Sequence, residues 1–319
     1  MFTIRTNNKE LVFESEIRVN ELINDVNKEF PVAKVNNRLR ELSYKFNYDA
    51  DVEFLTLANR EAVLIYEISL RFLIAMAFKN IYPDYKIRFK YSLSRSIFCY
   101  VTNKEGLDMG EVLENIEEEM ERLIALDLPF ERFTVSVKEA LDFYNKEDYQ
   151  DRIDILEYRP ESTVHFYKCD GYQNYMYGYM VPSTGYLSKY KLRSYEIGFI
   201  IQYPRAEAGT KIPRFVDAPK YVDTLRKASI WADVVEASSI ADLNRHFEND
   251  SIIEFVHMCE AKHNAMLTEI GDIVKQNIQD IRLIAIAGPS SSGKTTFSNR
   301  LRIELMTRGL KPVTISLDD

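Results

Sequence analysis

The sequence predicts an α+β N-terminal part, a helical linker, and then the first β-loop-α-β unit of an α/β domain. Three observations predict this arrangement. Short alternating apolar runs separated by turn residues fill the first two thirds of the chain, helical spacing of apolar residues follows, and a Gly/Ser loop then stands between an apolar run and a helical pattern. The predicted segments are 1–60, 61–210, 211–280 and 281–319.

The composition is that of an ordinary globular protein, with 319 residues, 46% hydrophobic and 28% charged. No long apolar run and no N-terminal signal segment stands out, so we expect a cytoplasmic protein. Three separated cysteines, Cys99, Cys169 and Cys259, fit a reducing compartment better than a disulfide framework. The net charge of −8 disfavours a simple nucleic-acid-binding protein, although it leaves room for a local basic patch.

Residues 1–60 predict a ubiquitin-like β-grasp fold, with another small α+β module as the alternative. FTIR and LVFE read as strands, and apolar residues at helical spacing predict a helix over 17–30. Asn36 and Asn37 can take the left-handed conformations of a tight hairpin turn, and VEFLTL predicts a closing strand.

Residues 61–210 predict a larger α+β unit around one very apolar helix over 61–78. We expect strands within 85–101, a helix over 109–126, and a helix that begins at a capping box of Ser136 and Glu139. Asp170 and Gly171 predict a further hairpin, and EIGFIIQYP a further strand. The acidic run over 117–119 predicts a solvated helix face.

Two features in the middle of the chain have both a structural and a functional interpretation. Cys259 and His263 lie four residues apart on a predicted helix, a spacing that suits two metal ligands, but with no third ligand nearby we favour packing. The tyrosines of the second hairpin fit sheet packing better than base stacking, which leaves RNA binding as the less favoured interpretation. These tyrosines are Tyr167, Tyr172, Tyr175, Tyr177 and Tyr179.

The spacing Gly288-x-x-x-x-Gly293-Lys294-Thr295 matches the Walker A pattern and lies between a predicted strand, IRLIAIA, and a predicted helix. Glycines let the backbone turn N–H groups towards phosphate, and the helix N-terminus adds a positive dipole end. Lys294 supplies a charge for phosphate and the Thr295 hydroxyl a ligand for Mg²⁺. The predicted cofactors are therefore ATP, or GTP, and Mg²⁺. The predicted binding residues are Gly288, Pro289, Ser290, Ser291, Ser292, Gly293, Lys294, Thr295 and Thr296.

Asp318 ends a second predicted strand, KPVTISL, at the edge of the sheet where ligands bind in open α/β folds. It could act as a general base for an attacking hydroxyl or hold Mg²⁺ through water, and capping of a following helix is the alternative. With Lys294 it forms the predicted catalytic pair.

The stretch GPSSSGKTTFSNRL followed by VTISLDD resembles the uridine kinase and phosphoribulokinase family. The resemblance covers about the last 40 residues. It implies an ATP-dependent nucleoside kinase that acts on a 5′-hydroxyl of uridine or cytidine, with Asp318 as the base. Because the later parts of such a kinase are not in the sequence, we expect an inactive fragment and a loosely ordered 281–319.

The first 210 residues resemble two domains of threonyl-tRNA synthetases. Residues 1–60 are similar to the TGS domain, and residues 61–210 to the editing domain, through YEISLRFLIAMA and the turn VPSTGYL. The order of segments is similar to that of a subgroup of bacterial nucleoside kinases. The histidines and the cysteine of editing domains are replaced by Ile68, Phe72, Met176 and Met180, so the resemblance implies the fold without the deacylation chemistry.

The sequence therefore predicts a nucleoside kinase with a nucleoside substrate and no membrane partner, and it leaves open a homo-oligomer. Two alternatives remain: another P-loop phosphotransferase or ATPase, and an N-terminal module that binds RNA or regulates the enzyme.

Overall fold

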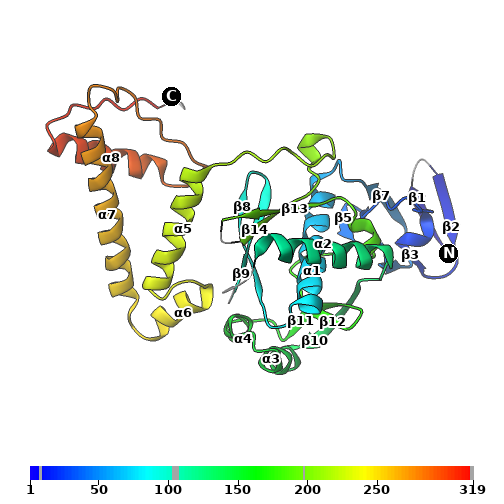
Figure 1. The fold of residues 1–319 in the computed structure, drawn as a ribbon. Coiled ribbons are helices and arrows are strands. Elements are labelled where there is room, and N and C mark those ends of the chain that lie inside the picture. Colours follow the sequence, from blue (N-terminus) through cyan, green and yellow to red (C-terminus); the bar gives the residue numbers. More distant parts are fainter. Residues whose placement is uncertain (7–8, 103–107, 197, 317–319) are drawn as a thin grey trace. The chain divides into compact units, whose positions relative to one another are not determined.

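The structure is a computed structural model that describes residues 1–6, 9–102, 108–196 and 198–316. It divides into two compact units, Met1–Leu225 and Arg226–Asp319 (Figure 1). The domain boundaries at residues 60, 210 and 280 stay predictions. Among the described helices, none combines the length and apolar character that a membrane crossing needs.

The first unit begins with a five-stranded sheet in the order β2-β1-β7-β4-β5. Its inner face packs on a core that includes Ile4, Val19 and Val35. The predicted hairpin is confirmed, because Asn36 and Asn37 both have positive φ, 48° and 60°. The elements of this region are β1 Phe2–Thr6, β2 Lys9–Phe13, β3 Ile17–Arg18, β4 Val32–Val35, β5 Arg38–Arg40, β6 Lys45–Phe46 and β7 Ala50–Leu55.

The predicted helix over 17–30 is wrong. Only a short 3-10 helix, η1 Val19–Leu22, forms there. The Asp25 carboxylate accepts the backbone N–H groups of Glu29 and Phe30, at 2.7 and 3.0 Å, and so takes donors that a helix would use. Lys28 then adopts a left-handed conformation with φ 53°, which is incompatible with a continuing helix.

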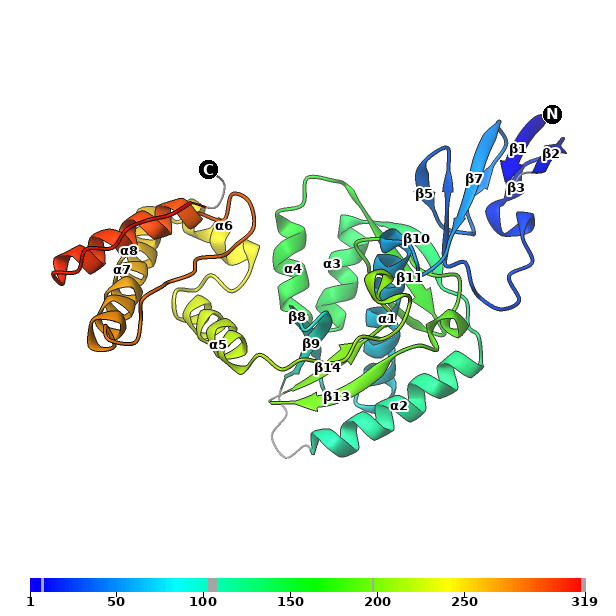
Figure 2. The same cartoon turned by 90° about the horizontal axis from the view of Figure 1, so that it is seen from above.

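The confirmed helix α1, Arg60–Ile81, lies in the middle of the first unit (Figure 2). It is buried over most of its circumference and supplies thirteen buried residues. The main core gathers α1 together with side chains from β9, β11, β14 and α2, so this helix organises the packing of the whole editing-like region.

Two antiparallel sheets flank the helix, one in the order β13-β14-β9-β8 and one in the order β10-β11-β12. The capping box of Ser136 and Glu139 is confirmed. So is the hairpin at Asp170 and Gly171, which have φ 44° and 81°. The elements are β8 Ile87–Leu93, β9 Ser96–Val101, α2 Met109–Ala125, β10 Glu131–Ser136, α3 Val137–Lys146, α4 Gln150–Glu157, β11 Thr163–Cys169, β12 Tyr172–Tyr175, η2 Thr184–Leu187, β13 Lys191–Tyr195, β14 Gly198–Gln202 and η3 Ala206–Ala208.

The acidic run over 117–119 is not wholly solvated as predicted. Glu119 is 7% exposed and receives two hydrogen bonds from Arg122, at 2.7 and 2.8 Å, and one from Asn80 at 2.7 Å. The hydrogen bonds from Arg122, against a smaller opposing effect of burial, lower the pKa of this carboxyl. It therefore ties α2 to α1 rather than facing water.

Residues 211–280 are mostly helical, as predicted, and one further helix, α8, follows them. Helix α8 packs on α7 around a core of Leu267, Val274, Leu301 and Leu305. Arg308 on the C-cap of α8 reinforces this contact through Asp272, at 2.7 Å. The helices are α5 Pro219–Val234, α6 Ile240–Glu248, α7 Ile252–Gln276 and α8 Lys294–Thr307.

The two strands predicted on either side of α8 do not form in the described part of the chain. Both runs lack regular secondary structure and are mostly exposed, although Ile281 and Ile286 of the first run pack against the core between α7 and α8. Leu283 and Val313 are 83% and 85% exposed. Parallel strands are stable when both of their faces are covered, and here neither run has such a cover. The P-loop kinase unit is therefore not confirmed, and only its helix is present.

Candidate functional site

The P-loop segment forms a tight turn that leads into α8. Gly293 precedes the helix with φ 82°, and Ser291 has φ 60°. At Gly288 an added Cβ atom would lie 2.7 Å from Ser292 Oγ, so that hydroxyl would have to rotate away. The Lys294 ammonium donates a hydrogen bond of 2.8 Å to the carbonyl oxygen of Pro289, which draws the turn closed. The result is a compact loop with a cation at a helix N-terminus.

The predicted binding residues 288–296 thus lie together, and Thr295 and Thr296 are exposed on the first turn of α8. Asp318 lies outside the described residues. The structure therefore brings together Lys294, Thr295 and the loop, while the predicted pairing of Lys294 with Asp318 stays a prediction.

The four positions at which editing domains carry polar groups are apolar and packed. Ile68, Phe72 and Met180 are at most 2% exposed, and Met176 packs against the same core. The Phe72 ring meets the ring of Tyr172 edge-on, with centroids 5.0 Å apart. These side chains fill the space with carbon and thioether sulfur, groups that cannot shuttle protons.

The V-P-S-T-G turn is joined to its surroundings by hydrogen bonds. Val181 N–H donates to Ser69 Oγ of α1 at 2.9 Å. Thr184 is fully buried; its hydroxyl donates to the Leu123 carbonyl at 2.6 Å and accepts the Leu128 N–H at 2.9 Å. The turn therefore links α1 to the end of α2 by hydrogen bonds.

Asp127 links the same turn to Lys28, which precedes β4 in the chain. The carboxylate accepts from Lys28 Nζ at 2.6 Å and from Ser183 Oγ. Burial alone would raise the pKa of Asp127, but these two donors together hold it below its usual value. The region of the five-stranded sheet and the rest of the first unit are thus joined by a charged contact as well as by apolar packing.

A third contact lies where β5 meets the editing-like region, and we call it the seam. Its centre is Glu41, which follows β5 directly. Glu41 Oε1 accepts the hydroxyl of Tyr167 and, at 3.3 Å, the backbone N–H of Met180. Burial raises the pKa of Glu41 despite these donors. Glu41 is therefore a half-buried carboxyl group that links the segment after β5 to β11 and to Met180.

Arginines and tyrosines surround Glu41 in the seam. The guanidinium of Arg132 lies 5.2 Å from the centre of the Tyr179 ring, and that of Arg40 lies 4.8 Å from the centre of the Tyr44 ring. Arg40 also donates to the Tyr179 hydroxyl at 3.5 Å. Its Nε–H is buried without an acceptor in the part of the chain that the structure describes. The seam therefore presents cations stacked on aromatic rings.

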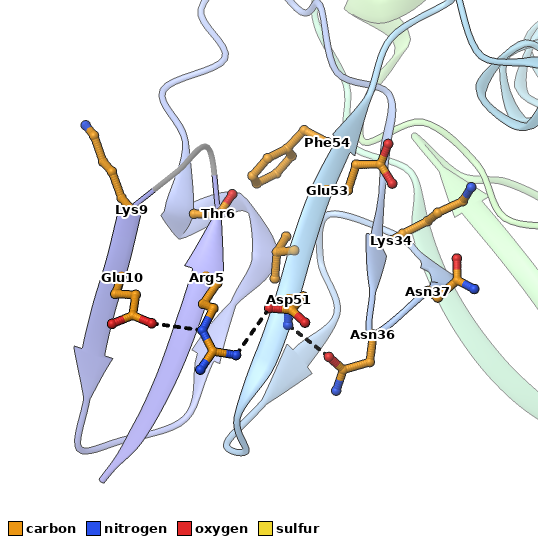
Figure 3. Close-up of a pocket in the computed structure, with 11 residues that line it drawn as sticks. Arg5, Thr6, Lys9, Glu10, Lys34, Asn36, Asn37, Asp51, Glu53 and Phe54 are labelled. Atoms are coloured by element: carbon orange, nitrogen blue, oxygen red, sulfur yellow. Dashed lines mark hydrogen bonds and ion pairs between the residues drawn. The ribbon is translucent and has the colours of Figure 1, made fainter.

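A shallow hollow of about 770 Å³ lies on the outer face of the five-stranded sheet (Figure 3). Its lining holds three basic and three acidic side chains, and some of them pair with one another. Arg5 contacts Glu10 at 2.8 Å and Asp51 at 3.6 Å, and Asp51 N–H donates to Asn36 at 2.9 Å (Figure 3). This mutual neutralisation favours no class of ligand, so the hollow supports no site.

Of the other candidates, His263 lies 2.9 Å from Arg300 of α8 through Nδ1, while Cys259 is partly exposed. No group of three or more potential metal ligands occurs among the residues that the structure describes. In the tyrosine cluster, Tyr167 is buried and Tyr177 is 58% exposed. Sheet packing thus accounts for the buried members, and Tyr179 lies in the seam.

No family model matches the chain. It is similar to proteins named threonine--tRNA ligase. The one from Desulforamulus reducens is 33% identical over 168 residues, which are 52% of this chain and 26% of that protein. The one from Carboxydothermus hydrogenoformans is 31% identical over 166 residues, 52% and 26%. The one from Caldanaerobacter subterraneus is 30% identical over 187 residues, 57% and 29%. The chain spans little more than a quarter of the length of these relatives.

This comparison overturns the predicted function. The relatives are named as ligases of threonine and tRNA, and nothing among them supports a nucleoside kinase or a nucleoside substrate. What it supports is the coarser prediction, a synthetase-like region over about half of the chain. The short kinase-like stretch does not specify a kinase, because a phosphate-binding loop identifies a ligand group and not a reaction.

The seam could not be recognised from the sequence. Its residues come from the two predicted regions, and Glu41 and Arg132 are far apart along the chain. One local signal was available: the stretch RLRE after the Asn-Asn turn places two arginines and a glutamate at the end of a hairpin. The contacts of this stretch with Tyr167 and Tyr179 are visible only in the three-dimensional structure.

Proposed function

We propose that this chain binds RNA of the tRNA type at the seam between its β-grasp and editing-like regions. The observation that carries the proposal is the arrangement of Arg40 and Arg132 over Tyr44 and Tyr179. The similarity of half the chain to threonine--tRNA ligases supports tRNA as the class of partner.

The physical chemistry of the seam suits single-stranded RNA. Guanidinium groups neutralise phosphates, and tyrosine rings and guanidinium planes offer faces on which unpaired bases stack. The net charge of the chain is −8, so binding would depend on this local patch rather than on the whole surface. The apolar side chains at 68, 72, 176 and 180 supply no group for hydrolysis, which makes the proposed role binding rather than deacylation.

The test is a fluorescence titration of the full chain with a labelled tRNA transcript that ends in CCA. We expect the double variant R40Q/R132Q to bind at least about tenfold more weakly, because each lost cation or stacking contact contributes ~1–3 kcal/mol. The salt dependence of its affinity should also be shallower.

Arg193→Gln is the matched control, because Arg193 is also exposed and stacked, over Phe215 at 5.0 Å, but lies on β13. It should bind as the unaltered chain does. Equal affinity of the double variant and the unaltered chain would overturn the proposal, as would affinity no tighter than the ~10⁻⁴ M of non-specific binding.

A second function is proposed for residues 288–296, namely binding of the polyphosphate of ATP or GTP with Mg²⁺. The specific observation is the closed loop in which Lys294 Nζ is held on the Pro289 carbonyl at the start of α8. Phosphate oxygens would replace that carbonyl as the acceptor for Lys294, the N–H groups of the turn would face them, and Thr295 would reach Mg²⁺.

Titration with a fluorescent ATP analogue tests this second proposal. Lys294→Ala should weaken binding by about tenfold or more through loss of a charge-assisted contact. Thr295→Ala should remove the dependence on Mg²⁺. Lys275→Ala, an exposed lysine on α7, is the matched control. Affinity that ignores both Mg²⁺ and Lys294 would contradict the assignment.

A further inference from the structure

We infer that Glu41 selects the base that enters the seam, favouring bases that carry an exocyclic amino group there over uracil, which carries a carbonyl. This inference rests on the proposed binding of RNA, and it assigns base selection to one side chain of the same site.

The geometry gives the two carboxylate oxygens of Glu41 different tasks. Oε1 is occupied by the Tyr167 hydroxyl and the Met180 N–H. No hydrogen bond from the described residues ends on Oε2. Two donors on one oxygen fix the orientation of the carboxylate, so the second oxygen is a positioned acceptor rather than a mobile one.

Aromatic and cationic side chains on which a base could stack lie near that acceptor. Glu41 contacts Tyr167 and lies near Arg132, whose guanidinium stacks on Tyr179. Because the Arg132 guanidinium covers a face of the Tyr179 ring, a base would stack on that guanidinium, with its edge towards the residues at the centre of the seam. A carboxylate accepts a hydrogen bond from the N4 amino group of cytosine, whereas the O4 carbonyl of uracil would meet it with repulsion between two acceptors.

The side-chain oxygen of a glutamine at this position could still accept both of these hydrogen bonds. Glu41→Gln can therefore keep its amide oxygen on Tyr167 and Met180 and place its amide nitrogen at the position of Oε2. The group at that position changes from acceptor to donor, while the shape and the packing of the seam stay the same. This makes the variant a test of selection rather than of folding.

The experiment measures fluorescence anisotropy of the full chain with labelled oligocytidylate and oligouridylate of equal length at one salt concentration. We expect the unaltered chain to prefer oligocytidylate by about fivefold, the size of one hydrogen bond gained against one acceptor clash. Glu41→Gln should bind oligouridylate at least as tightly as oligocytidylate. Glu10→Gln, an exposed glutamate paired with Arg5 on the outer face of the sheet, should keep the original preference.

The outcomes separate this inference from the proposed function. If neither oligonucleotide nor tRNA binds, the proposed function itself fails. If both oligonucleotides bind with equal affinity, or if Glu41→Gln keeps the cytosine preference with an unchanged circular dichroism spectrum, RNA binding stands and the role of Glu41 is overturned.

Discussion

At the scale of single residues, the fold of the first unit depends on a few buried polar groups. Thr184 is the clearest, because its hydroxyl both donates to and accepts from the backbone at zero exposure. A buried N–H that loses its only partner costs about 1–3 kcal/mol.

Thr184→Val keeps the shape of the side chain and removes its oxygen. We expect it to lower the free energy of unfolding of the first unit by ~1–3 kcal/mol, measured by urea denaturation followed by tyrosine signals. Thr163→Val, at the exposed start of β11, is the control and should change stability by less than about 0.5 kcal/mol. A Thr184 variant as stable as its control would show that the hydrogen bonds of the Thr184 hydroxyl contribute nothing to the free energy of unfolding.

At the scale of elements, the β4–β5 hairpin positions Arg38 to Arg40 and hence the seam. Its turn uses two asparagines in left-handed conformations, and glycine tolerates the second such position better than asparagine does. Asn37→Gly should therefore keep or slightly raise the thermal midpoint of the first unit, whereas Asn37→Val should lower it because a β-branched residue resists positive φ. The comparison of the two midpoints by circular dichroism checks this, and equal midpoints would contradict it.

Elements with a local cause could be predicted from the sequence. The turns at Asn36 and Asp170 and the cap at Ser136 are each specified by two adjacent or near residues, so the sequence sufficed for them. The helix over 17–30 was wrongly predicted because apolar spacing did not reveal that Asp25 takes its backbone donors. The strands around α8 could not be judged from sequence, since a strand exists only with its partners.

The candidate sites also differ in whether their cause is local in the sequence or arises from tertiary packing. The loop at 288–296 is contiguous, so its pattern was visible, although the reaction inferred from it was not correct. The seam is assembled from residues that lie more than 130 positions apart, such as Arg40 and Tyr179. No periodicity within either region predicts such a contact, because it is produced by tertiary packing alone.

At the scale of the whole molecule, the two units carry different spectroscopic reporters. All 20 tyrosines precede Leu225, whereas the single tryptophan, Trp231, lies in the second unit with Lys262 at 5.4 Å from its ring. The described cores are also separate, since Leu267 and Leu301 belong to a cluster of the second unit alone.

We therefore expect two unfolding transitions, one followed by tyrosine and one by tryptophan fluorescence, which do not coincide. Mg²⁺ with ATP should raise only the tryptophan transition, and tRNA only the tyrosine transition, because each ligand stabilises the unit that binds it. Coincident transitions that shift together with either ligand would show instead that the chain unfolds as one cooperative body.

The packing around α1 limits which side chains its buried positions can accept. Gly178 lies so close to Ile68 that even a single added methyl would come 2.7 Å from the isoleucine side chain. Imidazole at positions 68 and 72 would now need room, water and hydrogen-bond partners that the surrounding aromatic rings have taken. A histidine introduced at position 68 or 72 would therefore place a polar ring in an apolar core without hydrogen-bond partners, and we expect such a variant to be less stable than the unaltered chain.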